Sequence, residues 1–323
     1  MTTTRQYGTD SDVDTVDLSV VVVSYRCRNS LLECLRSLEA GIGVLKTEVI
    51  VVDNGSKDGT LESLRALYPD VLVKPMGMNA GFSRAANVGF SLARGRHVLA
   101  LNPDTLVMDS ALETLVMWLD EHPSAGVAAP RLLNPDGTDQ RTARALPTPS
   151  AGLFGRRSPL TRVFPNNRWS RGYLSGSERT GPDPFTTGWV SGAAMMVPAS
   201  VIACVGVFDE AFFLFWEDAD WCKRIKDAGF DTWCVPTAIV VHDEGTTRGH
   251  RWAPRIVVWF HRGSYLYWRK HHAPQPWNPL RWLAAGALAA RAAIVMVNEV
   301  LRAARASEGI NSPKPIRLPQ PSR

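Results

Sequence analysis

The stretch that decides the fold is LSVVVV at residues 18–23, matched by EVIVVD at residues 48–53. Both runs are apolar and rich in β-branched side chains, which is typical of strands buried on both faces of a parallel sheet. Between them, residues 29–40 have helical periodicity, and the capping box Ser30-x-x-Glu33 predicts that a helix begins there. The three segments together predict a β-α-β unit.

The same alternation continues along the chain and predicts an α/β fold: a Rossmann-like, mostly parallel sheet covered by helices on both faces. In such a sheet, ligands bind where the strands end. Further helices are expected at residues 60–67, 82–94, 109–121, 199–204 and 217–228, and further strands or apolar segments at residues 71–73, 97–101, 189–197 and 238–241.

The composition favours a globular core, because the 323 residues are 45% hydrophobic and 21% charged. The five cysteines form no C-x-x-C pair, so neither a disulfide framework nor a zinc ribbon is expected, and a reducing cytoplasm fits best. Residues 1–17 lack the pattern of a secretory signal and are expected to form a disordered acidic tail. Residues 306–323 are expected to form a second disordered tail.

Basic side chains are concentrated in two zones, and the formal net charge of the chain is +5. Residues 140–177 carry seven arginines and no acid, and residues 248–270 combine arginines with interleaved tryptophans. Tryptophan beside basic side chains suits the headgroup layer of a membrane. We therefore expect a cytoplasmic protein that binds peripherally to the inner face of the cell membrane, with no nucleic-acid partner.

Residues 281–305 are apolar enough for a membrane segment, although Arg291 interrupts them. Their polar side chains gather on about one third of a helical wheel. This predicts an amphipathic helix that lies in the membrane plane, at the end of a membrane-associating region over residues 251–305. The alternative, a helix that packs on the catalytic domain and never meets lipid, stays open. The polar residues of the wheel are Arg281, Arg291, Asn298, Glu299, Arg302 and Arg305.

Asp53 follows a predicted buried strand and precedes Asn54-Gly55. An aspartate there often closes a turn by bonding its own backbone. Alternatively, its carboxylate accepts the imide N–H of uracil or thymine, which would discriminate against cytosine, whereas guanine remains compatible. The sequence leaves both interpretations open.

Asn102-Pro103-Asp104 ends another predicted strand, where an isolated N-P-D usually forms a turn. Asp104 is also a candidate carboxylate ligand for a divalent cation, Mg²⁺ or Mn²⁺. His242 follows the last predicted strand and is either a core histidine or a second ligand beside Asp104.

Two helix starts carry further candidates. Asn79 to Asn87, including Arg84, opens a helix whose amides suit phosphate, although helix capping explains it equally well. Glu217, Asp218 and Asp220 begin another helix, where the helix dipole stabilises acidic side chains. The aromatic run at residues 212–216 precedes them, and partial desolvation there would suit a general base.

The motifs of rival enzyme classes are missing: no G-x-G-x-x-G follows the first strand, and neither a P-loop nor a G-x-S-x-G elbow occurs. The order of the remaining motifs resembles the GT-A fold glycosyltransferases of family 2, in particular their rhamnosyltransferase-like members. The resemblance covers residues 18–249. It rests on VVVVSYR (20–26), VIVVDNGSKDGT (49–60), NAGFSRAANVG (79–89), LNPDT (101–105), GWVSGAAMMV (188–197), FDEAFFLFWEDADWCKR (208–224) and VHDEG (241–245).

The resemblance implies roles for individual residues. Asp218 would be the catalytic base, Asp53 would contact the nucleobase, and Asp104, with His242, would hold the metal. Asn102 stands where the family's D-x-D element has its first acid. The nucleotide site would comprise Ser24, Tyr25, Asp53, Asn79, Arg84, Asn102 and Asp104, and the acceptor site would comprise Trp189, Gly192, Ala193 and Glu217.

The resemblance further implies an inverting, metal-dependent transfer from a nucleoside-diphosphate sugar to a lipid-linked or polysaccharide acceptor in cell-wall or surface glycan synthesis. It favours dTDP-rhamnose as the donor and a polyprenyl-diphosphate-linked sugar as the acceptor. A UDP- or GDP-sugar donor and a catalytically inactive carbohydrate-binding scaffold remain alternatives. Residues 18–137 would form the nucleotide-binding half and residues 138–250 the acceptor half of the catalytic domain.

Overall fold

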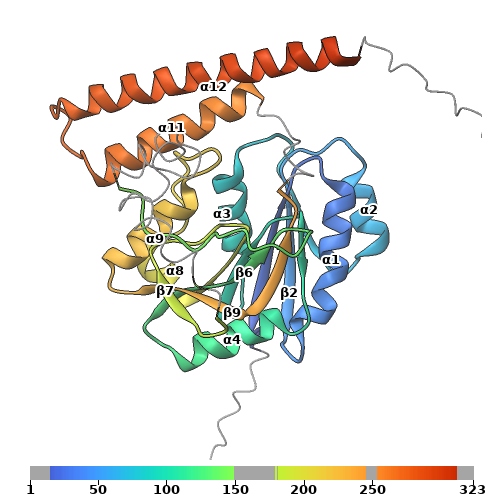
Figure 1. The fold of residues 1–323 in the computed structure, drawn as a ribbon. Coiled ribbons are helices and arrows are strands. Elements are labelled where there is room, and N and C mark those ends of the chain that lie inside the picture. Colours follow the sequence, from blue (N-terminus) through green and yellow to red (C-terminus); the bar gives the residue numbers. More distant parts are fainter. Residues whose placement is uncertain (1–14, 149–178, 180, 245–252, 311–323) are drawn as a thin grey trace, which may run out of the picture. The chain divides into compact units, whose positions relative to one another are not determined.

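The computed structural model describes residues 15–148, 179, 181–244 and 253–310, of which residues 303–310 are described by their backbone alone (Figure 1). The chain divides into two units, Met1–Thr247 and Arg248–Arg323. The first contains the sheet and the candidate active site. The second contains two long helices, and each unit is described by itself.

The first four strands of the sheet are parallel, as the sequence predicts. They are β1 (Leu18–Ser24), β2 (Thr47–Asp53), β3 (Leu72–Pro75) and β4 (His97–Leu101), in the spatial order β3-β2-β1-β4. The helices α1 (Arg28–Ile42), α2 (Thr60–Leu67) and α3 (Phe82–Leu92) connect them. The chain therefore begins with the predicted β-α-β unit.

The capping box predicted at Ser30 is wrong. Helix α1 already begins at Arg28 after the N-cap residue Cys27, and no side chain caps it. The amide of Arg28 instead donates a hydrogen bond to Asp58 Oδ2 at 3.2 Å. A loop that lies far away in the sequence thus takes the place of a local cap.

The second half of the sheet is mixed. Beyond β4 the order continues β8-β6-β9-β5, and β7 pairs with β9. Strand β8 is antiparallel to β4 and β6, whereas β6 and β9 run parallel. The bounds are β5 Thr105–Val107, β6 Ala125–Leu133, β7 Phe185–Thr187, β8 Ala194–Pro198 and β9 Asp231–His242.

The strand residues face two apolar layers alternately. Val20 and Val22 of β1 contribute to the layer that is covered by α1, α2 and α4 (Ala111–Glu121). Val21 and Val23 contribute to the opposite layer, under α3, α8 (Ala199–Val205) and α9 (Glu217–Asp227). Figure 1 shows α1 and α2 on one side of the sheet and α3 on the other. Burial on both faces explains the uninterrupted valine run, since each buried valine contributes roughly 1.5–3 kcal/mol.

The second unit consists of α11 (Pro254–His271) and α12 (Leu280–Ile310), which pack against each other. Within α12, the segment Leu280–Arg302 is long and apolar enough to cross a membrane. Arg291 and Glu299 are half-buried, whereas Leu283, Ile294, Val297 and Val300 are exposed. The apolar side of α12 therefore faces outward.

Candidate active site

Asp53 lies at the carboxyl end of β2, directly opposite Ser24 at the end of β1. Its side chain is only 1% exposed. Oδ2 accepts a hydrogen bond from the amide of Ser56 at 3.1 Å, so one oxygen closes the turn. Oδ1 is buried and has no hydrogen-bond partner among the described residues. The turn interpretation and the ligand interpretation are therefore compatible, one for each oxygen.

The polar residues after β1 have unequal positions. Ser24 is buried, and its hydroxyl lies 3.4 Å from Cys27 Sγ, so it faces the protein interior. Tyr25 is half-buried, with the guanidinium of Arg26 over its ring at 5.3 Å. The amide of Arg26 donates to Ser56 Oγ at 3.0 Å and ties the loops after β1 and β2 together.

Asn79 belongs to a loop that Asn54 holds. Asn54 Nδ2 donates to Asn79 Oδ1 at 3.1 Å and to the carbonyl of Gly81 at 3.2 Å, and Asn54 Oδ1 accepts from the amide of Ala80 at 2.8 Å. Asn54 was not among the predicted site residues, although its place after a buried strand is a usable signal. It fixes the loop that borders the space beside Asp53.

The start of α3 is bonded to the aromatic run that precedes α9. The amide of Phe82 donates to the carbonyl of Phe213 at 2.7 Å, and Ser83 Oγ donates to the carbonyl of Phe212 at 2.6 Å. A Cβ on Gly81 would lie 2.8 Å from Phe213, and Gly81 has φ +93°, so this position requires glycine. Helix α3 has no side-chain cap, and a backbone carbonyl of this run bonds its first amide instead. The side chain of Arg84 is 63% exposed, and its Nε lies 3.8 Å from Glu210 Oε2.

Asp104 and His242 converge, as the metal hypothesis requires. Thr105 at the start of β5 pairs with His242 at the end of β9. Asp104 Oδ1 lies 3.3 Å from His242 Nε2, and both side chains are almost completely buried. Asn102 Nδ2 lies 3.4 Å from the same nitrogen. A carboxylate oxygen and an imidazole nitrogen suit Mn²⁺ or Mg²⁺.

The described residues contain no group of three or more His, Cys, Asp and Glu side chains that would enclose a metal. Asp104 and His242 would therefore supply two ligands, which fits an ion that is completed by substrate phosphates and water. Strand pairing brings these residues together from positions far apart in the sequence.

Helix α9 begins after two residues with unusual backbone conformations. Phe215 and Trp216 have φ values of 70° and 74°, and such conformations cost about 1–3 kcal/mol each. They turn the chain so that Glu217 is buried and Asp218 is half-buried. Asp218 Oδ2 accepts the amide of Gly192 at 3.1 Å. The predicted base is therefore oriented while part of its surface remains accessible.

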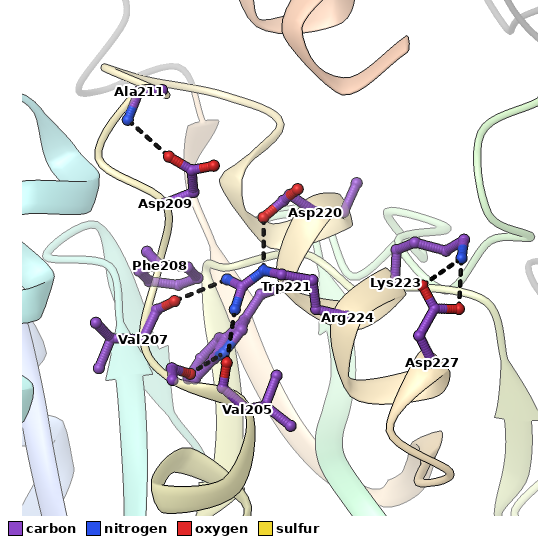
Figure 2. Close-up of polar contacts among 12 residues, drawn as sticks. Val205, Val207, Phe208, Asp209, Ala211, Asp220, Trp221, Lys223, Arg224 and Asp227 are labelled. Carbon is purple, nitrogen blue, oxygen red and sulfur yellow. Dashed lines mark hydrogen bonds and ion pairs between the residues drawn. The ribbon is translucent and has the colours of Figure 1, made fainter. Parts of the chain in front are cut away.

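Asp220 has a structural role that the sequence does not reveal. It is fully buried, and its Oδ2 accepts a hydrogen bond from Arg224 Nε at 2.9 Å (Figure 2). Arg224 also donates to the carbonyls of Val205 and Val207, at 3.1 Å and 2.7 Å. Asp220 therefore positions Arg224, which in turn binds the backbone at the end of α8 and in the loop after it.

Three of the predicted acceptor residues, Trp189, Gly192 and Ala193, lie on one continuous segment, whereas Glu217 begins α9. Trp189 is half-buried beneath the guanidinium of Arg144, which lies 5.4 Å from its ring. Trp189 Nε1 is buried and has no hydrogen-bond partner within the described ranges. Ala193 is buried, and its carbonyl accepts the amide of Asn102 at 2.9 Å. Asn102, Ala193, Gly192 and Asp218 thus connect the candidate metal ligands to the candidate base. The predicted site residues all lie within the described ranges, whereas Arg156, Arg157, Arg162, Arg168, Arg171, Arg248, Arg251 and Trp252 of the basic zones lie outside them.

Solved structures support the fold. A mannosyltransferase from Pyrobaculum calidifontis, solved in complex with GDP-mannose and Mn²⁺, superposes with a TM-score of 0.54. The match covers 93% of this chain and 82% of that protein, at 17% sequence identity. The mixed sheet with its helices is therefore a GT-A fold.

Curated relatives and a family model define the family. An N-acetylglucosaminyl-diphospho-decaprenol L-rhamnosyltransferase from Mycobacterium tuberculosis is 32% identical over 89% of this chain and 95% of its own length. A dTDP-rhamnosyl transferase from Shigella flexneri is 24% identical over 74% of this chain and 78% of its own length. The model of glycosyl transferase family 2 matches residues 19–196. The chain therefore belongs to glycosyl transferase family 2.

Proposed function

We propose that the chain transfers L-rhamnose from dTDP-rhamnose to a sugar linked to a polyprenyl diphosphate, during synthesis of a cell-wall or surface glycan. The likeness to the mycobacterial rhamnosyltransferase, which extends over almost the full length of both chains, supports this donor and this acceptor class. The observation that carries the chemistry is the placement of Asp218 at the start of α9: it is half-buried and accepts the amide of Gly192, whose neighbour Ala193 bonds to Asn102.

In the proposed reaction, Asp218 removes the proton from the acceptor hydroxyl. The acceptor oxygen attacks the anomeric carbon from the face opposite the diphosphate, the new glycosidic bond forms, and the bond to the diphosphate breaks. The anomeric configuration is inverted, and dTDP leaves with the bonding electron pair. The amide of Gly192, which donates to Oδ2, keeps the carboxylate in position for the proton transfer.

The donor diphosphate is proposed to lie near Asp104 and His242. A divalent cation bound there would neutralise the negative charge that develops on the departing diphosphate. Asp104 supplies a hard oxygen ligand, and His242 supplies a nitrogen 3.3 Å from it. Asp53 Oδ1, buried and without a hydrogen-bond partner among the described residues, is proposed to accept the imide N–H of thymine.

The second unit is proposed to hold the enzyme on the inner face of the cell membrane, where a lipid-linked acceptor is found. The outward apolar side of α12 supports this placement, since Leu283, Ile294, Val297 and Val300 are exposed. Trp277, which precedes α12, and Trp282, in its first turn, are 80% and 76% exposed. Exposed tryptophan next to basic side chains is suited to the membrane interface.

Thermal unfolding with dTDP, UDP, GDP and CDP, each with and without Mn²⁺, tests the donor proposal. We expect dTDP with Mn²⁺ to raise the unfolding temperature most, CDP to raise it least, and Asp104→Ala to remove most of the Mn²⁺ dependence. A larger shift with GDP would move the donor to a GDP-sugar, because the carboxylate of Asp53 also suits guanine.

Transfer is tested directly with dTDP-rhamnose and N-acetylglucosamine linked to a short polyprenyl diphosphate. The expected product carries one rhamnose, and its anomeric configuration is determined by NMR. If donor binding occurs without transfer or donor hydrolysis, the scaffold alternative gains support.

A further inference from the structure

Gln140 holds His242 at two points. Its Nε2 donates a hydrogen bond to the backbone carbonyl of His242, and its Oε1 lies 3.0 Å from Nδ1 of the same residue. Gln140 is only 6% exposed, so water does not compete freely for these bonds. A single side-chain amide thus spans the ring and the backbone of a candidate metal ligand.

This arrangement determines which ring nitrogen carries the proton. A backbone carbonyl accepts hydrogen bonds and never donates them, so the amide group that faces it must be the NH₂ group. The oxygen of Gln140 then faces Nδ1, which must donate. In the neutral ring, Nε2 is therefore left with a lone pair.

The lone pair of Nε2 points toward a carboxylate. Asp104 Oδ1 lies 3.3 Å from it, so two electron-rich atoms approach each other within the protein. Asn102 Nδ2, at 3.4 Å, is a long donor to the same nitrogen. A cation between Nε2 and Oδ1 converts this repulsion into attraction from both sides.

The position of Gln140 is set independently of His242. The amide of Gln140 donates to the carbonyl of Leu132 in β6 at 2.9 Å, and Asp139 forms a bridge with Leu133. The intervening turn is closed by the amide of Asn134, which donates to the carbonyl of Thr138 at 2.7 Å. Gln140 is therefore anchored at the carboxyl end of β6 by contacts that do not involve His242.

We propose that Gln140 is a positioning residue: it fixes His242 with the proton on Nδ1 and directs the lone pair of Nε2 at the divalent cation that Asp104 also binds. The inference rests on the metal site of the proposed function. Residues that hydrogen-bond to metal ligands typically change metal affinity about tenfold to a hundredfold when they are replaced.

The test compares Mn²⁺ affinity, measured by electron paramagnetic resonance in the presence of dTDP, in the parent, Gln140→Met and Gln140→Glu. Methionine fills the space but cannot bond, so Gln140→Met should weaken Mn²⁺ binding about tenfold to a hundredfold. Glutamate still accepts the hydrogen bond from Nδ1 but cannot donate to the carbonyl of His242, so the Mn²⁺ affinity of Gln140→Glu should lie between those of the parent and Gln140→Met. Equal affinity of Gln140→Met and the parent would overturn the inference, as would a glutamate variant no better than the methionine variant.

The matched control is Asn87→Leu. The side-chain amide of Asn87 also makes two hydrogen bonds to backbone: Nδ2 donates to the carbonyl of Phe208 at 2.9 Å, and Oδ1 accepts from the backbone N–H of Phe208 at 3.1 Å. Neither bond involves Asp104 or His242. Asn87→Leu should lower the unfolding temperature at least as much as Gln140→Met and leave Mn²⁺ affinity unchanged. A similar loss of affinity in Asn87→Leu would assign the effect to general destabilisation and contradict the inference.

Imidazole ¹⁵N chemical shifts of His242 provide a readout without metal. The parent should show a protonated Nδ1, and Gln140→Met should show a mixture of the two neutral tautomers. An unchanged spectrum in Gln140→Met would overturn the positioning role. A parent that binds Mn²⁺ no better than Asp104→Ala would instead overturn the proposed metal site, so the two failures are distinguishable.

Discussion

At the scale of single residues, the two carboxylate oxygens of Asp53 have different roles: one stabilises the turn after β2, and the other is proposed to bind the nucleobase. Oδ2 takes the amide of Ser56, whereas Oδ1 has no partner within the described residues. In Asp53→Asn the side-chain oxygen can still close the turn, and the new NH₂ group then faces the nucleobase. We expect dTDP affinity to fall by about 1.5–3 kcal/mol, the value of a hydrogen bond to a charged group.

The same substitution should reduce the difference in binding affinity between dTDP and CDP, because N3 of cytosine accepts a hydrogen bond that the new NH₂ group donates. Isothermal titration with dTDP, UDP and CDP measures both effects. If Asp53→Asn lowers the affinity for all three nucleotides equally, Asp53 supports the loop and does not read the base.

Asp218 differs from its neighbours Glu217 and Asp220 in being only half-buried. We expect Asp218→Asn to lower the transfer rate about a hundredfold to ten-thousandfold, the usual contribution of a positioned general base. Donor affinity should stay within a few-fold of the parent, because the base acts on the acceptor proton. Steady-state transfer assays, with dTDP titration as the control, measure the two effects. Equal rates for the parent and Asp218→Asn would place the base elsewhere.

At the scale of elements, the Asp220–Arg224 pair fixes α9 to the loop after α8. Asp220 is fully buried, and Arg224 bonds to it and to two carbonyls. We expect Arg224→Met to lower the free energy of unfolding by about 3–5 kcal/mol, because it leaves the Asp220 charge buried without its partner. Denaturant titration measures the loss. The double variant Asp220→Leu/Arg224→Met should recover part of it, and no recovery would contradict this account.

His97 joins β4 to α4 and makes stability depend on pH. Its Nε2 lies 2.9 Å from Asp120 Oδ1, and burial lowers the pKa of His97 below the usual 6.5, although Asp120 opposes the shift. The folded state thus prefers the neutral ring. The resulting stability is present above about pH 6.5 and is lost as the pH falls through the folded-state pKa.

We therefore expect the urea concentration at the unfolding midpoint to decrease when the pH is lowered from 7.5 to 5.5. The decrease should be smaller in His97→Asn than in the parent. The carboxyl groups with lowered pKa, such as Asp17 and Asp58, titrate from ordinary values near 3.8 and contribute only at lower pH. An identical pH dependence in the parent and His97→Asn would assign the effect to other groups.

The sequence predicts elements well where local pattern and tertiary role agree. The valine-rich β1 and the helix α2 lie where the pattern puts them. Burial on both faces leaves a continuous apolar run in β1, whereas α2 buries one face through Thr60 and Leu64. Strand β6, with the sequence AGVAAPRLL, is not predicted. Alanines pack into sheets without a strong strand preference, and the pairing with β9 shifts register between Pro130 and Arg131.

The tripeptide Asn-Pro-Asp occurs twice, and its two copies have different roles because strand pairing, which cannot be read from the sequence, gives them different neighbours. Asn102-Pro103-Asp104 and Asn134-Pro135-Asp136 have the same letters. The first meets His242 through the pairing of β5 with β9, whereas Asp136 bonds only within its own turn, to Thr138. Gln140 is not predicted for the same reason, since the fold and not the sequence brings His242 to it.

At the scale of the whole molecule, the chain combines a catalytic unit with a helical unit that exposes apolar side chains on α12. On α12, Ile294 is 62% and Val297 is 56% exposed, whereas Arg291 is half-buried and its pKa is lowered by burial. The segment Leu280–Arg302 has 23 residues, enough to cross about 30 Å of hydrocarbon. The choice between a helix in the membrane plane and a span therefore depends on energy as well as length.

We expect α12 to lie in the membrane plane, because a charge such as Arg291 at mid-bilayer costs about 2.5–3.5 kcal/mol on insertion scales. The full-length protein should sediment with anionic liposomes and be released by high salt or alkaline wash, whereas a chain truncated after Pro274 should stay in the supernatant. The double variant Ile294→Asp/Val297→Asp should weaken binding, and Met117→Asp, which changes an equally exposed apolar residue of α4, should not. Resistance to alkaline extraction would establish a span, and absence of binding at low salt would favour a helix that never meets lipid.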